Sequence, residues 1–425
     1  MIYLMLALFV LFLFIGIPIA FTLGIITLLV MQLNGYPLTL IAQRVFVGLD
    51  SFPLMALPLF ILAGNIMNRT GVTDKLWNFA RSLIGHKPAG MGHVTVLTSM
   101  LFASMSGSAL AAAGGLGPIQ IKGMKEDGFK DETAAAICAA SSTIGPIIPP
   151  SIVYVLYGVL GGVSVGRLFL GGIIPGIMMG LSLMTYIWYL GHSNPGQFVL
   201  HPKPNMVHIW KSFKEAFLSL LSPIIILGGI FGGIFTPTEA AAIASAYSIL
   251  LGIYYRSITL DALWEVLESS ARVSASIMLI IGFASGFSWL LTAIGASQLF
   301  ISFVSQAGIS KFFILLLLNF GLLVVGCFVE TNSAVVLLTP ILVPAMVAVG
   351  IDPVHLGIIL CVNLLIGILT PPMGMALYVV QKVSSIPFDR IAYRVLPMIF
   401  ILVIVLLLVT YIPSLVTFLP EIVMG

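Results

Sequence analysis

Charged residues are scarce in this chain: Asp, Glu, Lys and Arg together make up 8% of its 425 residues, whereas hydrophobic residues make up 60%. The mean hydropathy is +1.16. A soluble protein of this length could not bury so much apolar surface. Because apolar runs of membrane length recur along the sequence, we predict an all-α polytopic membrane protein. The runs are continuous and do not alternate polar with apolar residues, which excludes an outer-membrane β-barrel.

Cysteine and histidine are also scarce, and neither type is clustered. Cys138, Cys327 and Cys361 lie in apolar stretches without paired spacing, which indicates small core residues. The six histidines form no metal-binding pattern such as His-x-x-Glu-His. No G-x-x-x-x-G-K-[ST] loop is present, so uphill work must draw on an ion gradient or a partner. The sequence therefore predicts no enzyme, no resident cofactor and no nucleic-acid partner.

Apolar segments are expected at residues 2–33, 52–67, 91–121, 133–165, 168–190, 216–235, 239–254, 274–294, 312–349, 356–380 and 391–419. The first of them could be one long tilted helix or two short helices hinged at Gly16-Ile17-Pro18. It lacks a preceding basic region, so we do not expect a cleavable signal peptide. Segments 91–121 and 312–349 place small and polar residues at mid-length. We predict that each forms a re-entrant hairpin, two short helices that meet at a tip inside the membrane.

The sequence aligns with itself, without gaps, when it is shifted by 222 residues. Besides apolar identities, this shift matches five pairs of glycine or proline, namely Pro118/Pro340, Gly128/Gly350, Gly145/Gly367, Pro149/Pro371 and Pro150/Pro372. Apolar identities are common in a membrane protein, but so many glycine and proline matches on one diagonal are not. We predict two repeats, each a re-entrant hairpin followed by a discontinuous transmembrane helix, broken at 145–150 or at 367–372.

The distribution of basic residues indicates that the repeats are inverted. If residues 69–87 face the cytoplasm, the first hairpin enters the membrane from the cytoplasmic side and the second enters from the other side. Of the 18 Lys and Arg residues, this topology leaves only Arg44, Arg167 and Lys311 outside. We divide the chain into N-terminal scaffold helices (1–67), a cytoplasmic amphipathic connection (68–90), the first hairpin and broken helix (91–165), scaffold helices and connecting arms (166–311), the second hairpin and broken helix (312–381) and a C-terminal helix (382–425).

A helix that stops inside the membrane leaves unpaired carbonyls on one half and unpaired amides on the other. These groups must be buried in protein or meet a ligand. Carbonyls beside hydroxyls suit a bare cation such as Na⁺, and amides at a helix start suit a carboxylate. We predict two related cation sites, each between a hairpin tip and a helix break, with an anionic substrate between the tips. The alternative is that the small residues only permit close helix packing.

The candidate cation ligands are Ser104, Ser106, Gly107, Ser141, Ser142, Gly145 and Pro149 in the first repeat, and Gly326, Cys327, Thr331, Gly367, Thr370 and Met373 in the second. The candidate substrate-binding residues are Ser108, Asn332, Asn363, Pro150 and Pro372. Glu330 is an ionisable residue at membrane depth, and it could carry a proton, bind the cation or cap a helix. Thr236 or Thr238 can cap a helix whose first turn contains Pro237 and Glu239, and we assign these residues no transport role.

Four motifs resemble those of the large membrane subunit of tripartite ATP-independent periplasmic (TRAP) transporters. They are LDSFPLMALPLFILAGNIMNRTGVTDKL at 49–76, SGSALAAAGGLGPI at 106–119 paired with SSTIGPIIPPS at 141–151, GIFTPTEAAAIASAY at 233–247, and NLLIGILTPPMG at 363–374. The resemblance covers essentially the whole chain, and the motifs occur in the right order.

This resemblance implies Na⁺-driven uptake of an organic acid, such as sialic acid or a four-carbon dicarboxylate, through a bacterial inner membrane. It implies an elevator movement, a small four-helix membrane subunit as a partner, and a periplasmic substrate-binding protein that delivers the acid. By position, the cation sites would include Ser104, Ser106, Gly145, Gly326, Thr331, Gly367 and Thr370. The second-repeat equivalent of Ser151 is Met373, so the two sites cannot be chemically identical.

Other transport mechanisms remain as alternatives. A stand-alone carrier of the same architecture would need no binding protein, and it could be driven by Na⁺ or by protons through Glu330. A channel fits less well, because paired re-entrant hairpins favour alternating access.

Overall fold

The computed structural model describes residues 1–194, 196–296, 298–299 and 310–425, without the side chains of Ile2, Leu6, Ala103, Ser104 and Ser106. The described residues form helices and connections, and they include no β-strand. The helices of the first half are α1 (Ile2–Ile15), α2 (Ile19–Leu33), α3 (Thr39–Leu49), the 3-10 helix η1 (Phe52–Met55), α4 (Ala56–Arg69), α5 (Val72–Ile84), α6 (Gly90–Ser106), α7 (Ala109–Glu126), α8 (Asp131–Ser142), α9 (Ile152–Gly161) and α10 (Val165–Ser193). Those of the second half are α11 (Met206–Phe231), α12 (Pro237–Tyr254), α13 (Leu260–Ala293), α15 (Lys311–Phe328), α16 (Thr331–Ala348), α17 (Pro353–Gly367), α18 (Met375–Ser384), α19 (Phe388–Tyr411) and α20 (Ser414–Met424).

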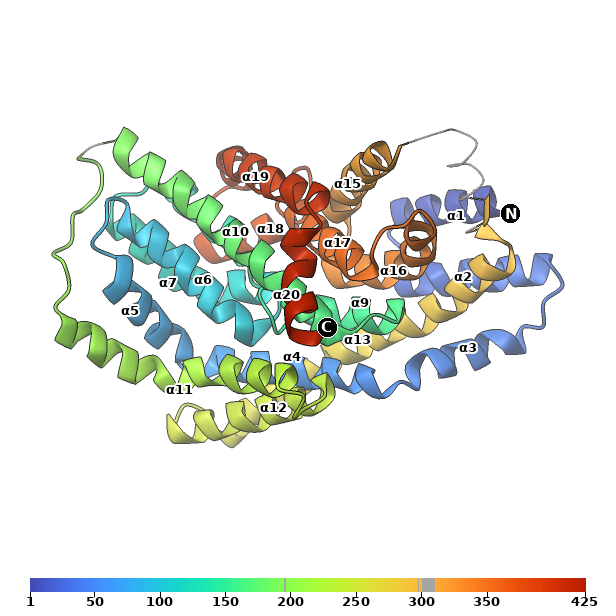
Figure 1. Cartoon of the computed structure of the whole chain (residues 1–425), viewed down its shortest axis with the longest axis horizontal. Coiled ribbons are helices and arrows are strands. Elements are labelled where there is room, and N and C mark those ends of the chain that lie inside the picture. Colours follow the sequence, from blue (N-terminus) through green and yellow to red (C-terminus); the bar gives the residue numbers. More distant parts are fainter. Residues whose placement is uncertain (195, 297, 300–309) are drawn as a thin grey trace.

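The N-terminal apolar segment forms two helices. α1 ends at Gly16, whose φ of 84° lies in the left-handed region that glycine adopts without a steric penalty. Pro18 stands directly before α2, where its missing amide costs no helical hydrogen bond. The chain turns back at these residues, so that α1 and α2 pack against each other (Figure 1). Of the two alternatives for this segment, the structure has two short helices hinged at Gly16-Ile17-Pro18.

The two repeats predicted from the 222-residue shift are present in the fold. Adding 222 to the bounds of α7 gives those of α16, and α8 and α17 begin at equivalent residues. The correspondence extends outward, since α2 matches α12 and α10 matches α19. One difference concerns the long helix α13, whose counterpart is divided into α3, η1 and α4. Pro53 lies in the first turn of η1, whereas α13 contains no proline to interrupt it.

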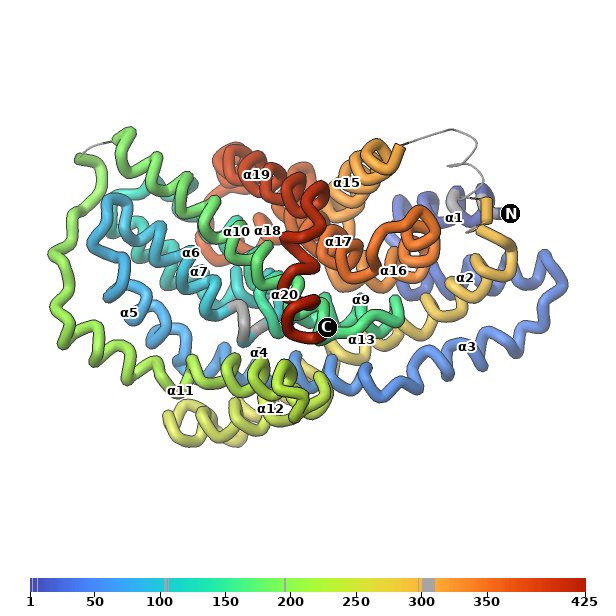
Figure 2. The backbone as a smooth tube through the Cα atoms, viewed as in Figure 1, coloured from blue at the N-terminus to red at the C-terminus, as the bar shows by residue number. Residues whose placement is uncertain are grey.

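Each repeat contains a hairpin followed by an interrupted helix. α6 and α7 form the first hairpin, and α15 and α16 form the second. In Figure 1 the two hairpins extend toward opposite ends of the long axis, and their tips meet near the centre. The tube in Figure 2 follows the same two reversals, one in the cyan part of the chain and one in the orange part. The repeats are therefore inverted.

The second halves of the interrupted helices are exchanged between the repeats. α9, from the first repeat, packs against α16 of the second hairpin, and α18, from the second repeat, packs against α7 of the first hairpin. α8 and α17 each remain with the hairpin of their own repeat. Both repeats therefore contribute to one continuous buried core.

A second layer of helices lies along one side of this core. α4 packs along α12, and α13 packs along both α2 and α3 (Figure 1). α5 leads from α4 to the first hairpin and lies between α6 and α11. Its partners thus belong to both parts of the molecule, the hairpin core and the outer layer.

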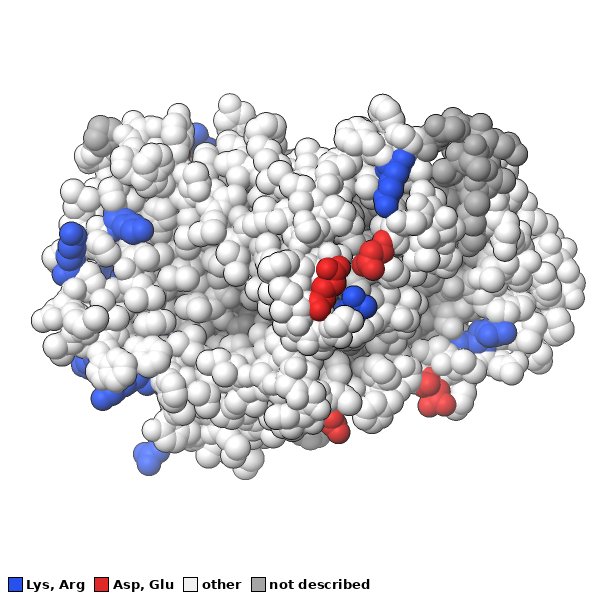
Figure 3. Space-filling model, in the orientation of Figure 1, with Lys and Arg blue, Asp and Glu red and all other residues white. Residues whose placement is uncertain are grey.

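Seven of the described helices, including α10, α11, α13 and α19, are long and apolar enough to cross a membrane. Large apolar side chains cover their outer faces; Ile224 and Phe400 are 63% and 68% exposed. Exposing such apolar surface to water would cost a free energy of about 25 cal/mol per Å². On the face in Figure 3, Lys and Arg gather mainly at the left end, a small group of acidic and basic side chains lies near the centre, and most of the remaining surface is uncharged. The chain is a multi-pass membrane protein.

Candidate functional site

Both hairpin tips and both helix breaks meet at one small central pocket. The first tip contributes Gly107 and Ser108, and the second contributes the residues 330–332. Pro146 and Val153 come from the first interrupted helix, and Leu365 and Ile368 come from the second. Segments more than 200 residues apart in sequence therefore surround one space.

The two tips are built alike, because each ends in a side chain that caps the following helix. Ser108 accepts a hydrogen bond from the amide of Ala111 at 3.3 Å. Its equivalent, Glu330, accepts one from the amide of Ser333 at 3.0 Å. These caps satisfy amides at the starts of α7 and α16, which have no partner within the helix. Of the three roles considered for Glu330, the structure displays the capping arrangement.

The first break begins where α8 ends at Ser142. The hydroxyl of Ser142 donates to the carbonyl of Ala139 at 2.7 Å, and that of Thr143 donates to the carbonyl of Ala140 at 2.8 Å. A hydroxyl that donates in this way keeps its lone pairs for another partner. Within the described residues, no backbone amide donates to the carbonyls of Gly145 or Pro146. These oxygens form the kind of acceptor group that was predicted for a cation.

The second break is held by an unusually close helix contact. A Cβ atom placed on Gly367 would lie 2.6 Å from the Cα atom of Gly326, so α15 and α17 can approach only because both residues are glycine. The thiol of Cys327 donates to the carbonyl of Thr370 at 3.0 Å, which fixes the end of α15 to the break. The hydroxyl of Thr370 donates to the carbonyl of Ile366 at 3.1 Å.

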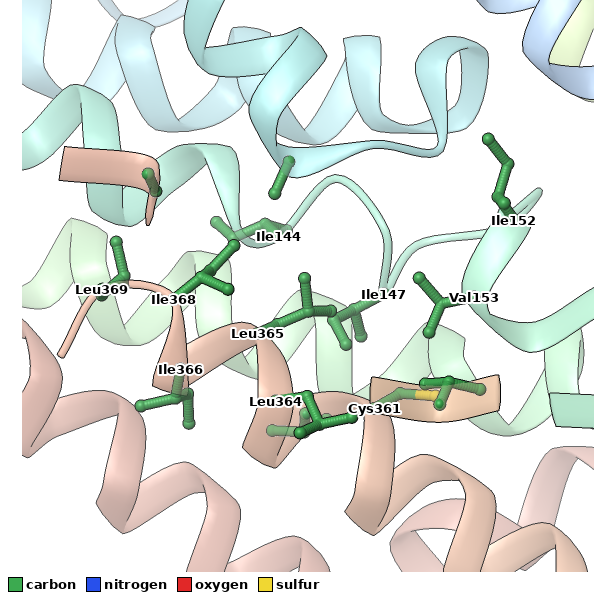
Figure 4. Close-up of a cluster of buried hydrophobic side chains, with 14 of the residues drawn as sticks. Ile144, Ile147, Ile152, Val153, Cys361, Leu364, Leu365, Ile366, Ile368 and Leu369 are labelled. Atoms are coloured by element: carbon green, nitrogen blue, oxygen red, sulfur yellow. The ribbon is translucent and has the colours of Figure 1, made fainter. Parts of the chain in front are cut away.

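Apolar side chains join the two breaks to each other. Figure 4 shows Ile144 and Ile147 of the first break beside Ile368 and Leu365 of the second, and all four are almost completely buried. This contact supports both breaks where neither has regular hydrogen bonding.

Several candidate residues do not line the central pocket. Asn363 is fully buried, and its amide donates to Asn319 Oδ1 at 2.6 Å. Ser141 donates to the carbonyl of Cys138 and lies 3.3 Å from the hydroxyl of Ser99. The side chain of Met373 is 41% exposed. The side chains of Ser104 and Ser106 lie outside the described residues. The remaining candidates without a pocket contact are Ser142, Gly145, Pro149, Pro150, Gly326, Cys327, Gly367, Thr370 and Pro372.

Two buried polar networks were not expected from the sequence. One joins Asn363 to Asn319, whose amide donates to the hydroxyl of Thr410 on α19 at 3.1 Å. The other joins Ser141 to Ser99, which accepts from the amide of Gln120 at 3.0 Å. The 222-residue shift pairs Ser141 with Asn363. This match of two polar residues within apolar helices was the sequence feature from which the networks could have been predicted. The networks position α8 and α17 ahead of their breaks.

Inverted repeats whose hairpin tips meet two interrupted helices at a central pocket define a secondary transporter. Comparison with known proteins gives the family. The sequence model described as "Tripartite ATP-independent periplasmic transporter, DctM component" matches residues 6–415. The chain belongs to this family, and it is therefore the large permease subunit of a TRAP transporter and not an enzyme.

Individual relatives agree with this assignment. The chain is 44% identical over 415 residues to the sialic acid TRAP transporter large permease protein SiaM of Vibrio cholerae, with 97% of each chain covered. It is 38% identical over 382 residues to the C4-dicarboxylate TRAP transporter large permease protein DctM of Pseudomonas aeruginosa, covering 90% of this chain and 89% of that one. The solved YdaH transporter of Alcanivorax borkumensis matches with a TM-score of 0.62 over 88% of both chains at 14% identity, a likeness of fold alone.

The contact between α15 and α17 gives a first prediction. Gly326→Ala should push the two helices apart and lower the midpoint of thermal unfolding, because overpacking of this kind typically costs about 1–3 kcal/mol. Gly321→Ala, on the same helix, is the control, since its Cβ would meet nothing within 4 Å. Equal unfolding midpoints for the two variants would contradict the close approach.

The capping role of Glu330 gives a second prediction. A cap needs an acceptor oxygen but no titratable proton, so Glu330→Gln should remain folded and keep transport activity. Glu330→Ala should lower the unfolding midpoint, since loss of a cap costs about 1 kcal/mol. Uptake by the two variants and their thermal unfolding would be measured side by side. A folded Gln variant that no longer transports would favour the proton-carrier or cation-ligand role.

Proposed function

We propose that this subunit imports an organic acid together with Na⁺, by an elevator movement of its hairpins and broken helices. The observation that carries the proposal is the single pocket where both tips and both breaks meet. In this arrangement, helix starts and unwound backbone face one central space from two opposite directions. Such a site can be presented to either side of a membrane in turn.

Oxygen atoms at the two breaks support Na⁺ as the coupling ion. At the first break, the carbonyls of Gly145 and Pro146 accept no hydrogen bond from a described backbone amide, and the hydroxyl of Ser142 retains acceptor capacity. At the second break, the hydroxyl of Thr370 also donates to a carbonyl of its own helix and keeps its lone pairs for another partner. Unwound carbonyls of this kind, with hydroxyls beside them, suit a small hard cation. The exposed Met373 supplies no hard oxygen, so we expect the second site to rely on Thr370 and backbone atoms.

A carboxylate is the substrate group that the helix starts favour. α7 and α16 begin at the pocket, and Val153 places the start of α9 beside it. Helix N-termini carry partial positive charge and bind anions. Asn332 lies at the same place, and its Oδ1 atom is buried without a partner among the described residues. Greater similarity to the sialic acid permease than to the dicarboxylate permease makes a sialic acid the first substrate to test.

The exchange of α9 and α18 supports movement of the core as one body. Each hairpin packs against the broken-helix half that the other repeat supplies, so we expect them to move together. α4, α11, α12 and α13 lie beside the hairpins and broken helices and would form the scaffold. α5 is the connection that would have to follow the movement, since it contacts both parts.

The expected partners and orientation follow from the family and the charge distribution. TRAP large permease subunits work with a small membrane subunit and a periplasmic binding protein, and we expect a four-helix protein and a binding protein for the acid here. We place the connections rich in Lys and Arg in the cytoplasm, with the protein in a bacterial inner membrane.

Reconstituted transport tests the proposal. With its small subunit in proteoliposomes, the protein should accumulate labelled sialic acid only when an inward Na⁺ gradient and the binding protein are both present. Labelled succinate, measured in parallel with its own binding protein, tests the dicarboxylate alternative. Uptake that is independent of the binding protein, or that a proton gradient alone can drive, would assign the chain to the stand-alone type of carrier.

The role of Thr370 gives a sharper prediction. Thr370→Val removes the hydroxyl but keeps the shape, so the Na⁺ concentration at half-maximal uptake should rise by about tenfold or more, the effect of losing about 1.4 kcal/mol of ion binding. Thr185→Val is the matched control, because the Thr185 hydroxyl also donates to its own helix, at 2.9 Å, on the exposed side of α10. An unchanged Na⁺ dependence in Thr370→Val would exclude this hydroxyl as a ligand.

A further inference from the structure

A second cavity, of about 550 Å³, lies apart from the central pocket. Its walls are α5, the first turns of α11, and residues 201–204 of the connection between α10 and α11. Each wall supplies one cation, namely Arg81, Lys203 and Lys211. Among the described residues that line the cavity, Glu215 is the only carboxylate. The cavity lies at the end of the molecule where basic side chains gather in Figure 3.

None of the three cations forms an ion pair with a carboxylate of the described residues, although the charge of Arg81 acts on the buried Asp127 carboxyl. Elsewhere among the described residues, ion pairs hold four Lys or Arg side chains; for example, Arg69 lies 2.7 Å from Glu265, and Lys125 lies 2.7 Å from Asp131. Unpaired cations around a concave surface produce a positive potential that favours an anion. The cavity therefore has the charge of a binding site rather than that of a neutralised surface.

Two histidines add hydrogen-bonding groups to the same walls. The Nε2 atom of His201 lies 3.0 Å from Oδ1 of Asp127, a fully buried carboxylate that also accepts from the amide of Met91. Burial raises the pKa of the Asp127 carboxyl, and these two hydrogen bonds oppose the shift. This contact fixes the imidazole ring of His201 at the cavity. His86 also lines the cavity, and its Nδ1 atom is buried without a partner among the described residues.

The surroundings of the cavity are those of a membrane interface. Trp210 and Phe213, in the first turns of α11, stack with ring centroids 5.5 Å apart, and Trp210 is 57% exposed. The Lys214 ammonium lies 5.5 Å from the centre of the Trp210 ring. α11 is one of the helices long enough to span a membrane. Exposed tryptophan beside lysine at the start of such a helix is typical of the headgroup level of a bilayer.

We propose that this cavity binds a phosphate group, of the kind presented by the headgroup of an anionic phospholipid. Arginine and lysine from three walls match the charge and oxygen atoms of a phosphate, and the imidazoles of His86 and His201 lie at the same walls. The aromatic side chains at the start of α11 would lie beside the acyl chains. The site is independent of the transport function proposed above.

Occupancy of this site would join three parts of the molecule. α5 leads to the first hairpin, α11 belongs to the outer layer, and the connection holding His201 contacts Asp127 at the base of that hairpin. A phosphate bound between them would therefore stabilise the arrangement of α5 relative to α11.

Native mass spectrometry of the full-length protein tests the proposal. The detergent-purified protein would be titrated with phosphatidylglycerol, with phosphatidylcholine and with inorganic phosphate. The test variant combines Arg81→Gln, Lys203→Gln and Lys211→Gln. The control variant combines Lys87→Gln, Lys122→Gln and Lys130→Gln, which are exposed, remove the same charge and lie outside the cavity. Gel filtration and thermal unfolding would show that both variants are folded.

We expect the test variant to bind phosphatidylglycerol at least about tenfold more weakly than the control variant, with little change for phosphatidylcholine. That result supports the site with a lipid as the source of the phosphate. Inorganic phosphate binding that is lost only in the test variant, without a lipid preference, supports the site with a soluble source. Equal binding of both anions by the two variants would overturn the proposal.

Discussion

Backbone groups that are released inside a membrane must find partners within the protein, and this constraint governs the fold. The breaks after Ser142 and Gly367 each interrupt the ladder of helical hydrogen bonds where lipid cannot replace it. The two hairpin tips, which approach from opposite ends of the molecule, supply partners for these backbone groups. Ser108 and Glu330 cap the helices that start there, Cys327 binds the carbonyl of Thr370, and the apolar contact in Figure 4 closes the space between the breaks. The oxygens that stay unpaired are then available to a ligand.

The repeats share a plan but differ in chemistry. Gly326 and Gly367 bring α15 and α17 into backbone contact, whereas the first repeat has Ser104 at the position of Gly326. The caps differ as well, a neutral hydroxyl at Ser108 and a carboxylate at Glu330. Pseudo-symmetry therefore fixes where the two breaks lie, while the individual side chains decide how each is held. The two breaks are therefore not chemically equivalent.

Glycine and proline made the fold largely predictable from the sequence. Pro149-Pro150 and Pro371-Pro372 have strong local effects on the backbone, so the hairpins, breaks and inverted repeats could be placed in advance. The site was predicted less completely, because its side chains depend on distant partners. Asn363 was expected beside the substrate, but it bonds with Asn319, which in turn bonds with Thr410 on α19, and neither partner is marked by a local pattern. The exchange of α9 and α18 has no local signal either.

That exchange has a consequence for how such a chain could have arisen. A single repeat on its own would leave the face of α7 that α18 covers, and the face of α16 that α9 covers, without a partner. A half-length ancestor could fill those faces only by pairing with a second, oppositely oriented copy of itself. Gene duplication would then have made an obligatory dimer permanent, and later divergence of the two halves would have produced the different side chains now found at the two breaks.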